Sequence, residues 1–128
     1  MSSHPVHQQA RGITYSKKHQ HVAVSNNYGD VHILDYNDLS KRVTTLLKPR
    51  EWCEVLVYSP NEAFLAIGSH DDSIYIYKIS ESGEYSLHWS ITFVHSSAIL
   101  AIDWTNDSKF IRAIDQAYAK IFYDVDAC

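Results

Sequence analysis

The 128-residue chain has few of the residues that build disulfide frameworks and cysteine-based metal sites. Its only cysteines, Cys53 and Cys128, are far apart in the sequence, and no Cys-x-x-Cys pair occurs. This excludes a zinc site of the usual cysteine spacing and favours a reducing compartment. We expect Cys53 to be a small buried residue of a strand, as free cysteines usually are.

Glycine is also scarce, with four residues in the whole chain. Neither glycine-rich phosphate loop, GxGxxG or GxxxxGK[ST], is present, and there is no GxSxG nucleophile elbow. We therefore expect no catalytic site and no cofactor.

The chain lacks long apolar runs and an excess of positive charge. No run approaches the ~18 apolar residues of a membrane span, and the polar start MSSHPVHQQARG has no apolar signal segment. The net charge is −4, whereas nucleic-acid-binding domains are usually basic. We expect a cytoplasmic protein that contacts neither membrane nor nucleic acid.

What the chain does have is alternation of apolar and polar residues in short segments. Apolar residues make up 45% of the sequence, and nine of them are Tyr, which favours strands. The alternation between polar turns predicts strands at residues 12–16, 21–25, 31–36, 42–48, 53–58, 63–68, 73–79, 85–94, 99–104, 109–114 and 120–125.

The strands fall into repeated units centred on the stretch from Val55 to Tyr77. Tyr15-Ser16 recurs as Tyr58-Ser59, 43 residues later, and Trp104-Thr105 follows after a further 46. A period of roughly 40–45 residues with four short strands is the signature of a WD40-type β-propeller. The alternative is chance alternation in an ordinary β-sandwich.

The predicted fold is therefore all-β, with about two and three-quarter propeller blades. We expect an irregular lead-in at 1–10, blades at 11–52 and 53–97, and a partial blade at 98–128. Propellers close with about four to eight blades, so this would be an incomplete ring with exposed apolar flanks. We expect those flanks to pack on further blades of the same or another chain.

The segment SKFIRAIDQAYAKIF permits a second interpretation. Phe110, Ile114, Ala117 and Ile121 recur at helical spacing. Its position in the repeat and its Tyr123-Asp124 ending favour a pair of strands instead.

The sequence YSPNEAFLAIGSHDDSIYIYKIS, followed by HSSAILAIDWTNDSKF, resembles the echinoderm microtubule-associated protein-like family. The resemblance implies a non-catalytic scaffold that binds tubulin or microtubule-associated proteins, located on cytoplasmic microtubules or in a cilium or axoneme. The Trp-Asp dipeptide is absent, because its places hold Leu34-Asp35, Tyr77-Lys78 and Tyr123-Asp124. The alternative is a WD40 adaptor in signalling or ubiquitin ligation.

Two polar clusters are expected to have structural roles. The spacing of His70, Asp71 and Asp72 does not suit zinc, so we expect Asp71 to accept backbone N–H bonds in a tight turn. His95 and Ser96 resemble the Gly-His element of WD repeats, which implies a buried hydrogen-bonding role for His95.

Basic residues in the turns are the candidate partner-binding groups. Lys17 and Lys18 lie in the first turn of the first unit, and Lys41 and Arg42 lie in a turn that an antiparallel meander places at the same end. A cationic rim there suits acidic tubulin tails. The remaining candidates are Lys48, Arg50 and Trp52, on the connection to the second unit.

Overall fold

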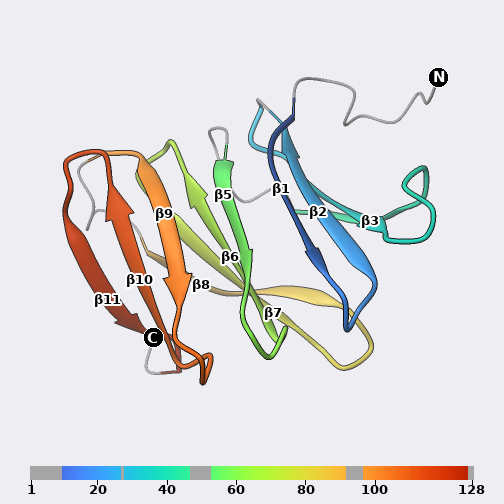
Figure 1. Cartoon of the computed structure of the whole chain (residues 1–128). Helices are drawn as coiled ribbons and strands as arrows, with labels where there is room; N and C mark the ends of the chain where they lie inside the picture. Colours follow the sequence, from blue (N-terminus) through green and yellow to red (C-terminus); the bar gives the residue numbers. More distant parts are fainter. Residues whose placement is uncertain (1–9, 27, 47–52, 92–96, 127–128) are drawn as a thin grey trace.

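The computed structural model describes residues 10–26, 28–46, 53–91 and 97–126, and their regular structure consists of β-strands (Figure 1). The strands are β1 (Ala10–Ser16), β2 (His21–Asn26), β3 (Val31–Asp35), β4 (Arg42–Leu46), β5 (Cys53–Tyr58), β6 (Phe64–Ser69), β7 (Ile74–Ile79), β8 (Tyr85–Ile91), β9 (Ile99–Trp104), β10 (Phe110–Asp115) and β11 (Lys120–Asp124). The all-β prediction is confirmed. Within the described ranges no helix is long and apolar enough to span a lipid bilayer.

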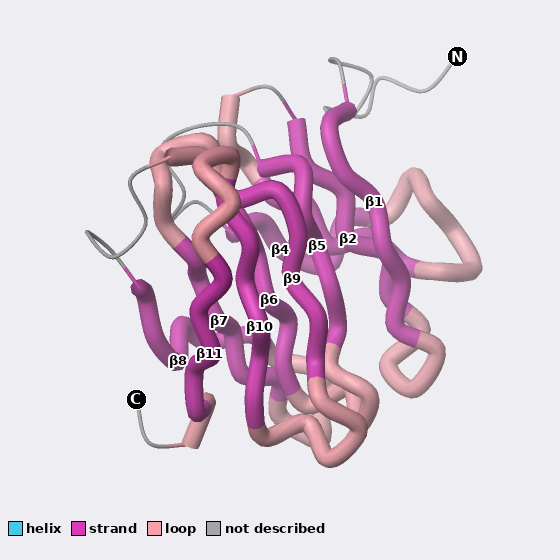
Figure 2. The backbone as a smooth tube through the Cα atoms, turned by 60° about the vertical axis from the view of Figure 1, so that its left-hand side comes forward, coloured by secondary structure: helices cyan, strands magenta, loops and turns pink. Residues whose placement is uncertain are grey.

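The strands form three antiparallel meanders. Their orders are β1-β2-β3-β4, β5-β6-β7-β8 and β9-β10-β11. The helical interpretation of the last segment is wrong, because Phe110 pairs with Asp124 and Ala113 with Ile121 across two antiparallel strands. The sheets stand next to one another, and the first strands β1, β5 and β9 lie side by side (Figures 1 and 2).

The repeat is visible in the irregularities of the sheets as well as in the sequence. The pairing register shifts between Ala10 and Gly12 in β1 and between Cys53 and Val55 in β5. In the third sheet the register shifts between Ala101 and Ile99 of β9, which pair with Ile114 and Asp115 of β10. A bulge strengthens the local twist of a strand, so each unit bends its first strand at the corresponding place.

The middle sheet is buried on both faces. Leu65 and Ile67 of β6 belong to a core shared with the β1–β4 sheet. Ala66 of β6 and Ile76 of β7 belong to a second core shared with the β9–β11 sheet. Because successive residues of a strand face opposite sides, both sets of residues must be apolar, which explains why LAIG and IYIY are almost uninterrupted apolar runs.

Gly68 of the middle sheet packs tightly against the third sheet. A Cβ atom at this position would lie 2.7 Å from Cγ2 of Ile99 and 3.2 Å from Cβ of Val55. A larger residue at position 68 therefore requires the Ile99 side chain or the two strands to shift.

The turns use few glycines. Gly29 and Gly83 have positive φ, but Gln20, Glu62, Asp72, Ser108 and Tyr118 also adopt this conformation. Residues with a Cβ pay a steric cost there, so the surrounding sheet pairings hold these turns in place.

Candidate interaction surface at the turn end of the first two sheets

The β1–β2 and β3–β4 turns lie at the same end of the first sheet, as the meander predicts. The Tyr36 backbone N–H donates to the Gln20 carbonyl oxygen at 2.8 Å, and the Asn37 side-chain amide donates to Gln20 Oε1 at 3.1 Å. Lys17 joins these three residues in lining a small open hollow of about 160 Å³. The two turns thus form one continuous surface.

This surface carries the described members of the predicted basic set. Lys17 and Lys18 are exposed in the β1–β2 turn, Lys41 is exposed in the β3–β4 turn, and Arg42 begins β4. The other predicted candidates, Lys48, Arg50, Trp52, His95 and Ser96, lie outside the described residues.

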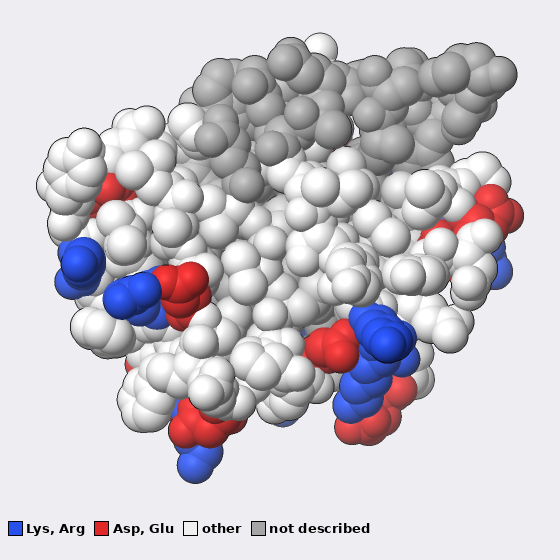
Figure 3. Space-filling model, in the orientation of Figure 1, with Lys and Arg blue, Asp and Glu red and all other residues white. Residues whose placement is uncertain are grey.

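Two of these cations have neighbours within the chain. Lys18 Nζ lies 3.5 Å from Glu81 Oε2 in the β7–β8 turn of the middle sheet. Arg42 Nη1 lies 3.5 Å from Nδ1 of His32. Figure 3 shows Lys and Arg side by side with Asp and Glu on the viewed face, not in a continuous area of one sign.

Glu62 connects the turn ends of the first two sheets, a role that no sequence pattern indicates. From the β5–β6 turn its carboxylate accepts the Ser16 hydroxyl at 2.8 Å and the Lys18 backbone N–H at 3.0 Å. Its backbone carbonyl lies 2.9 Å from His19 Nε2. Only the packing of the two sheets brings these groups together, so no local pattern could reveal the contact.

The same hydrogen bonds control the ionisation of Glu62. Burial alone would raise the pKa of the carboxyl, but the backbone N–H of Lys18, the Ser16 hydroxyl and the backbone N–H of Lys17 outweigh it and lower the pKa below its ordinary value. Glu62 is therefore ionised near neutral pH and accepts charge-assisted hydrogen bonds.

A second connection between the sheets is a chain of hydroxyl and imidazole groups. His21 Nδ1 lies 2.9 Å from the Tyr85 hydroxyl, which lies 2.7 Å from the Tyr58 hydroxyl. Burial raises the pKa of Tyr85 to about 12 and raises the pKa of Tyr58 further. Burial lowers the pKa of His21, and the electrostatic effect of the nearby His19 lowers this pKa further. The side chains of His21, Tyr85 and Tyr58 are thus uncharged at pH 7, and together they form a buried polar contact between β2 and the middle sheet.

The acidic pair that follows β6 shapes a turn. Asp71 Oδ1 accepts the Ser73 backbone N–H at 3.0 Å, and Oδ2 accepts the Tyr75 hydroxyl at 2.7 Å. Asp72 takes the left-handed conformation, with φ of 69°, and His70 is partly buried beside them. Among the described residues no group of three or more His, Cys, Asp or Glu side chains is placed to hold a metal ion.

Sequence reasoning missed the turn-forming acceptors of the other two sheets, which occupy the position that Ser69 holds in the middle sheet. Asn26 Oδ1 accepts the backbone N–H of Asp30 at 3.1 Å after β2. Asp115, which is fully buried, accepts the backbone N–H groups of Ala117 at 2.9 Å and Ala119 at 3.1 Å. In the turn after β10, Asp115 thus provides the side-chain acceptor that Ser69 provides in the middle unit.

Comparison with known proteins agrees with this fold. No protein-family model matches the chain. A solved structure, the β-propeller domain of Cps50 (Swd1) from Myceliophteria thermophila, superposes on 98% of the chain with a TM-score of 0.82 at 11% identity, over 45% of its own length. At that identity the similarity establishes the WD40 propeller fold and nothing further.

Sequence relatives identify the family. The chain is 38% identical over 106 residues to the ciliary WD repeat-containing protein ctxp80 of Euplotoides octocarinatus and 38% identical over 104 residues to human echinoderm microtubule-associated protein-like 3. It is also 35% identical over 79 residues to the 77 kDa echinoderm microtubule-associated protein of Lytechinus variegatus. The chain is homologous to the WD repeat region of the echinoderm microtubule-associated protein-like family.

The family predicted from LAIGSHDDSIYIY is thus confirmed. The matches cover 82%, 81% and 62% of this chain, but only 14%, 12% and 12% of ctxp80, the human protein and the Lytechinus protein. The chain therefore spans a small part of the length of these echinoderm microtubule-associated protein-like relatives and their ciliary homologue.

Proposed function

We propose that the chain belongs to a non-catalytic WD40 scaffold that binds tubulin or microtubule-bound proteins in the cytoplasm, including those of cilia and axonemes. The observation that carries this proposal is the homology of about four-fifths of the chain to proteins named as microtubule-associated or ciliary. A stack of rigid sheets with turns at its end suits this role, because it presents fixed side chains to a large partner.

We also propose that the open flanks of the sheet stack pack on further blades. Thr14 pairs with Ala23, which faces the middle sheet, so the neighbouring Ile13 and Tyr15 face the opposite way. Ile13 is 72% exposed, and at the other flank Phe122 of β11 is 67% exposed. Apolar side chains at such exposure on two sheet faces are typical of surfaces that another element covers.

We assign tubulin contact to the turn surface of the first sheet, with Lys17 and Lys41 as its main cations. Acidic protein tails are attracted to such lysines by charge complementarity, which acts mostly on association and weakens with salt. Lys18 contributes less in this proposal, because Glu81 already lies beside its ammonium group.

The test is co-sedimentation of the full chain with microtubules. We expect the protein in the pellet at physiological salt, and we expect the double variant Lys17→Glu/Lys41→Glu to bind about five- to tenfold more weakly. The matched control, Lys109→Glu/Lys120→Glu, makes the same change of charge at exposed positions of the third sheet and its β9–β10 turn, and should bind as the wild type does.

Two results would contradict the proposal at different levels. Absence of the wild-type chain from the pellet would refute microtubule binding and favour an adaptor in signalling or ubiquitin ligation. Equal binding by both double variants would leave microtubule binding in place and refute the assignment to Lys17 and Lys41.

A further inference from the structure

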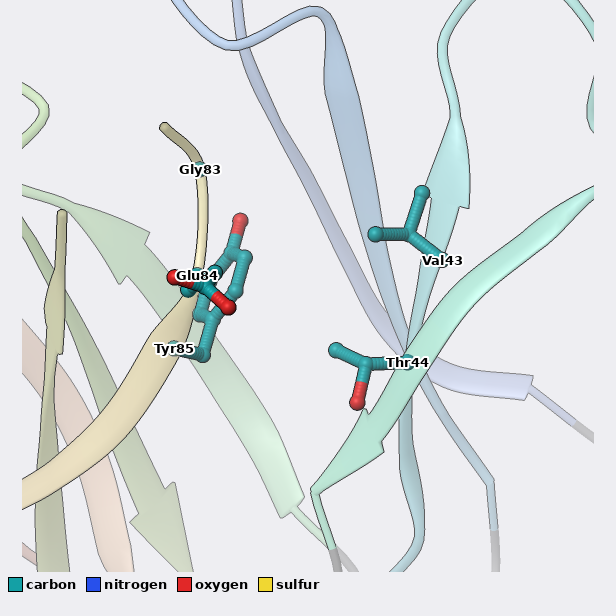
Figure 4. Close-up of a pocket in the computed structure, with 5 residues that line it drawn as sticks. All are labelled: Val43, Thr44, Gly83, Glu84 and Tyr85. Atoms are coloured by element: carbon teal, nitrogen blue, oxygen red, sulfur yellow. The ribbon is translucent and has the colours of Figure 1, made fainter. Parts of the chain in front are cut away.

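A second open hollow, of about 260 Å³, lies between the first and middle sheets (Figure 4). Val43 and Thr44 of β4 form one wall, and Gly83, Glu84 and Tyr85 form the other. Figure 4 shows Val43 and Thr44 pointing from β4 toward Glu84 and Tyr85. Because both walls belong to this chain, further blades on the flanks would leave the hollow unchanged.

The wall opposite β4 is held by packing and hydrogen bonds. The Tyr85 hydroxyl is directed inward to His21 and Tyr58, so the ring of Tyr85 is what faces the hollow. Gly83, with φ of 87°, approaches His21 so closely that a Cβ atom would lie 3.3 Å from its Cε1. The hollow is thus a preformed feature, which lowers the entropic cost of binding.

The strand beside the hollow has an edge that no described strand pairs with. β4 ends the sheet order β1-β2-β3-β4, and its only described partner is β3. Half of the backbone groups of an edge strand point away from the sheet and can receive another strand. An extended peptide added there would direct alternate side chains into the hollow.

The chemistry of the lining selects a basic side chain. Glu84 is the one charged residue among the five that line the hollow. Arg42, the cation of β4, contacts His32 and not Glu84. His32 pairs with Thr45, whose side chain lies on the face of the sheet opposite to that of Thr44. Val43 is 44% exposed, so Val43 and the Tyr85 ring offer apolar surface to the stem of a Lys or Arg.

We propose that the outer edge of β4 binds an extended peptide segment of a partner protein and that an Arg or Lys of this segment enters the hollow against Glu84. The volume is below the ~300–1,000 Å³ typical of small-molecule sites, which suits one long side chain of a larger ligand. This proposal is independent of microtubule binding, because it concerns a different surface and a basic partner segment.

The probe is a fluorescent, end-blocked peptide of alternating Thr and Val with a central Arg, titrated with the full chain in an anisotropy assay. A second peptide carries Glu in place of Arg. We expect the Arg peptide to bind and the Glu peptide to bind at least tenfold more weakly. Replacing Glu84 with Gln should weaken the Arg peptide about fivefold, which is what one partly exposed charge pair contributes.

The matched control is Glu81→Gln, which removes a carboxylate from the same turn but outside the hollow. This variant should bind the Arg peptide as the wild type does. A thermal unfolding curve for each variant establishes that it is folded.

Strand addition is tested with two N-methylated forms of the Arg peptide. Methylating the amides of one alternate set should abolish binding, while methylating the other set should not, because only one set points toward β4. Equal binding of the Arg and Glu peptides, or an unchanged affinity in Glu84→Gln, would overturn the basic-residue assignment. Equal effects of the two methylation patterns would overturn strand addition.

Discussion

Replacing Glu62 with Ala should destabilise the protein by breaking the contact between the first two sheets. The substitution removes the acceptor of the Ser16 hydroxyl, at 2.8 Å, and of the Lys18 backbone N–H, at 3.0 Å. Ser16 is fully buried, so its hydroxyl loses a partner that water does not readily replace. Ala at position 62 would adopt the same positive φ as Glu62, so the steric cost of this conformation is the same in the variant and in the wild type.

The expected loss is about 2 kcal/mol in the free energy of unfolding. A hydrogen bond to a charged group contributes about 1.5–3 kcal/mol when well protected. The Glu62 carboxylate is partly exposed, so about 1 kcal/mol for each of the two bonds is the appropriate value. Urea unfolding at pH 7, followed by tryptophan fluorescence, measures this change directly.

The pH dependence provides a further test of the same contact. The pKa of Glu62 is lowered in the folded protein, so its contribution is present above the unfolded pKa of about 4.3 and is lost as the pH falls through the folded value. The stability curves of the wild type and of Glu62→Gln should therefore converge at low pH.

The control is Glu81→Ala, in the neighbouring turn. The Glu81 side chain is 91% exposed, and the ion pair that the structure describes for it is with Lys18, which is also exposed. The stability of this variant should therefore equal that of the wild type. Equal effects of Glu62→Ala and Glu81→Ala, or a loss below about 0.5 kcal/mol for Glu62→Ala, would refute the reasoning.

Three further predictions concern buried groups. Gly68→Ala should cost about 1–3 kcal/mol of unfolding free energy, because the new methyl group meets Ile99 at 2.7 Å. In an Ile99→Ala background, which lacks this contact, the same substitution should cost less, and an undiminished cost would contradict the contact. Because the pKa of His21 is lowered in the folded protein, its contribution to stability is present above pH ~6.5 and is lost as the pH falls through the folded pKa. Urea unfolding between pH 5 and 7.5 should therefore give a flatter curve of stability against pH for His21→Gln than for the wild type, and parallel curves would argue against burial of His21. Burial raises the pKa of the Cys53 thiol to about 12, so mass spectrometry should find Cys53 alkylated by iodoacetamide in urea and not in the folded protein; rapid labelling without urea would contradict its burial.

The fold could be predicted from the sequence because the repeat and the alternation are local signals. β5 and β9 begin and end where the alternation predicts, at Cys53–Tyr58 and Ile99–Trp104. The fourth strand of the middle sheet is expected to extend to Val94, and residues 92–94 lie outside the described residues. β10 is shifted by one residue from the predicted 109–114 to Phe110–Asp115, because the end of a strand depends on pairing with its neighbours and is less sharply encoded than the strand itself.

The candidate surface could be predicted only in part. The meander places Lys17 and Lys41 at one end from sequence order alone. The carboxylate of Glu62, the His21–Tyr85–Tyr58 chain and the hollow beside Glu84 all join residues from different sheets. Their formation depends on how the sheets pack, and no spacing within one unit contains that information.

The most direct test of the central claim is binding of the purified chain to microtubules with and without their acidic tubulin tails. Co-sedimentation should place the wild type in the pellet with intact microtubules at physiological salt, and proteolytic removal of the tails should weaken binding about as much as Lys17→Glu/Lys41→Glu does. A chain that stays in the supernatant with both kinds of microtubule would contradict the account.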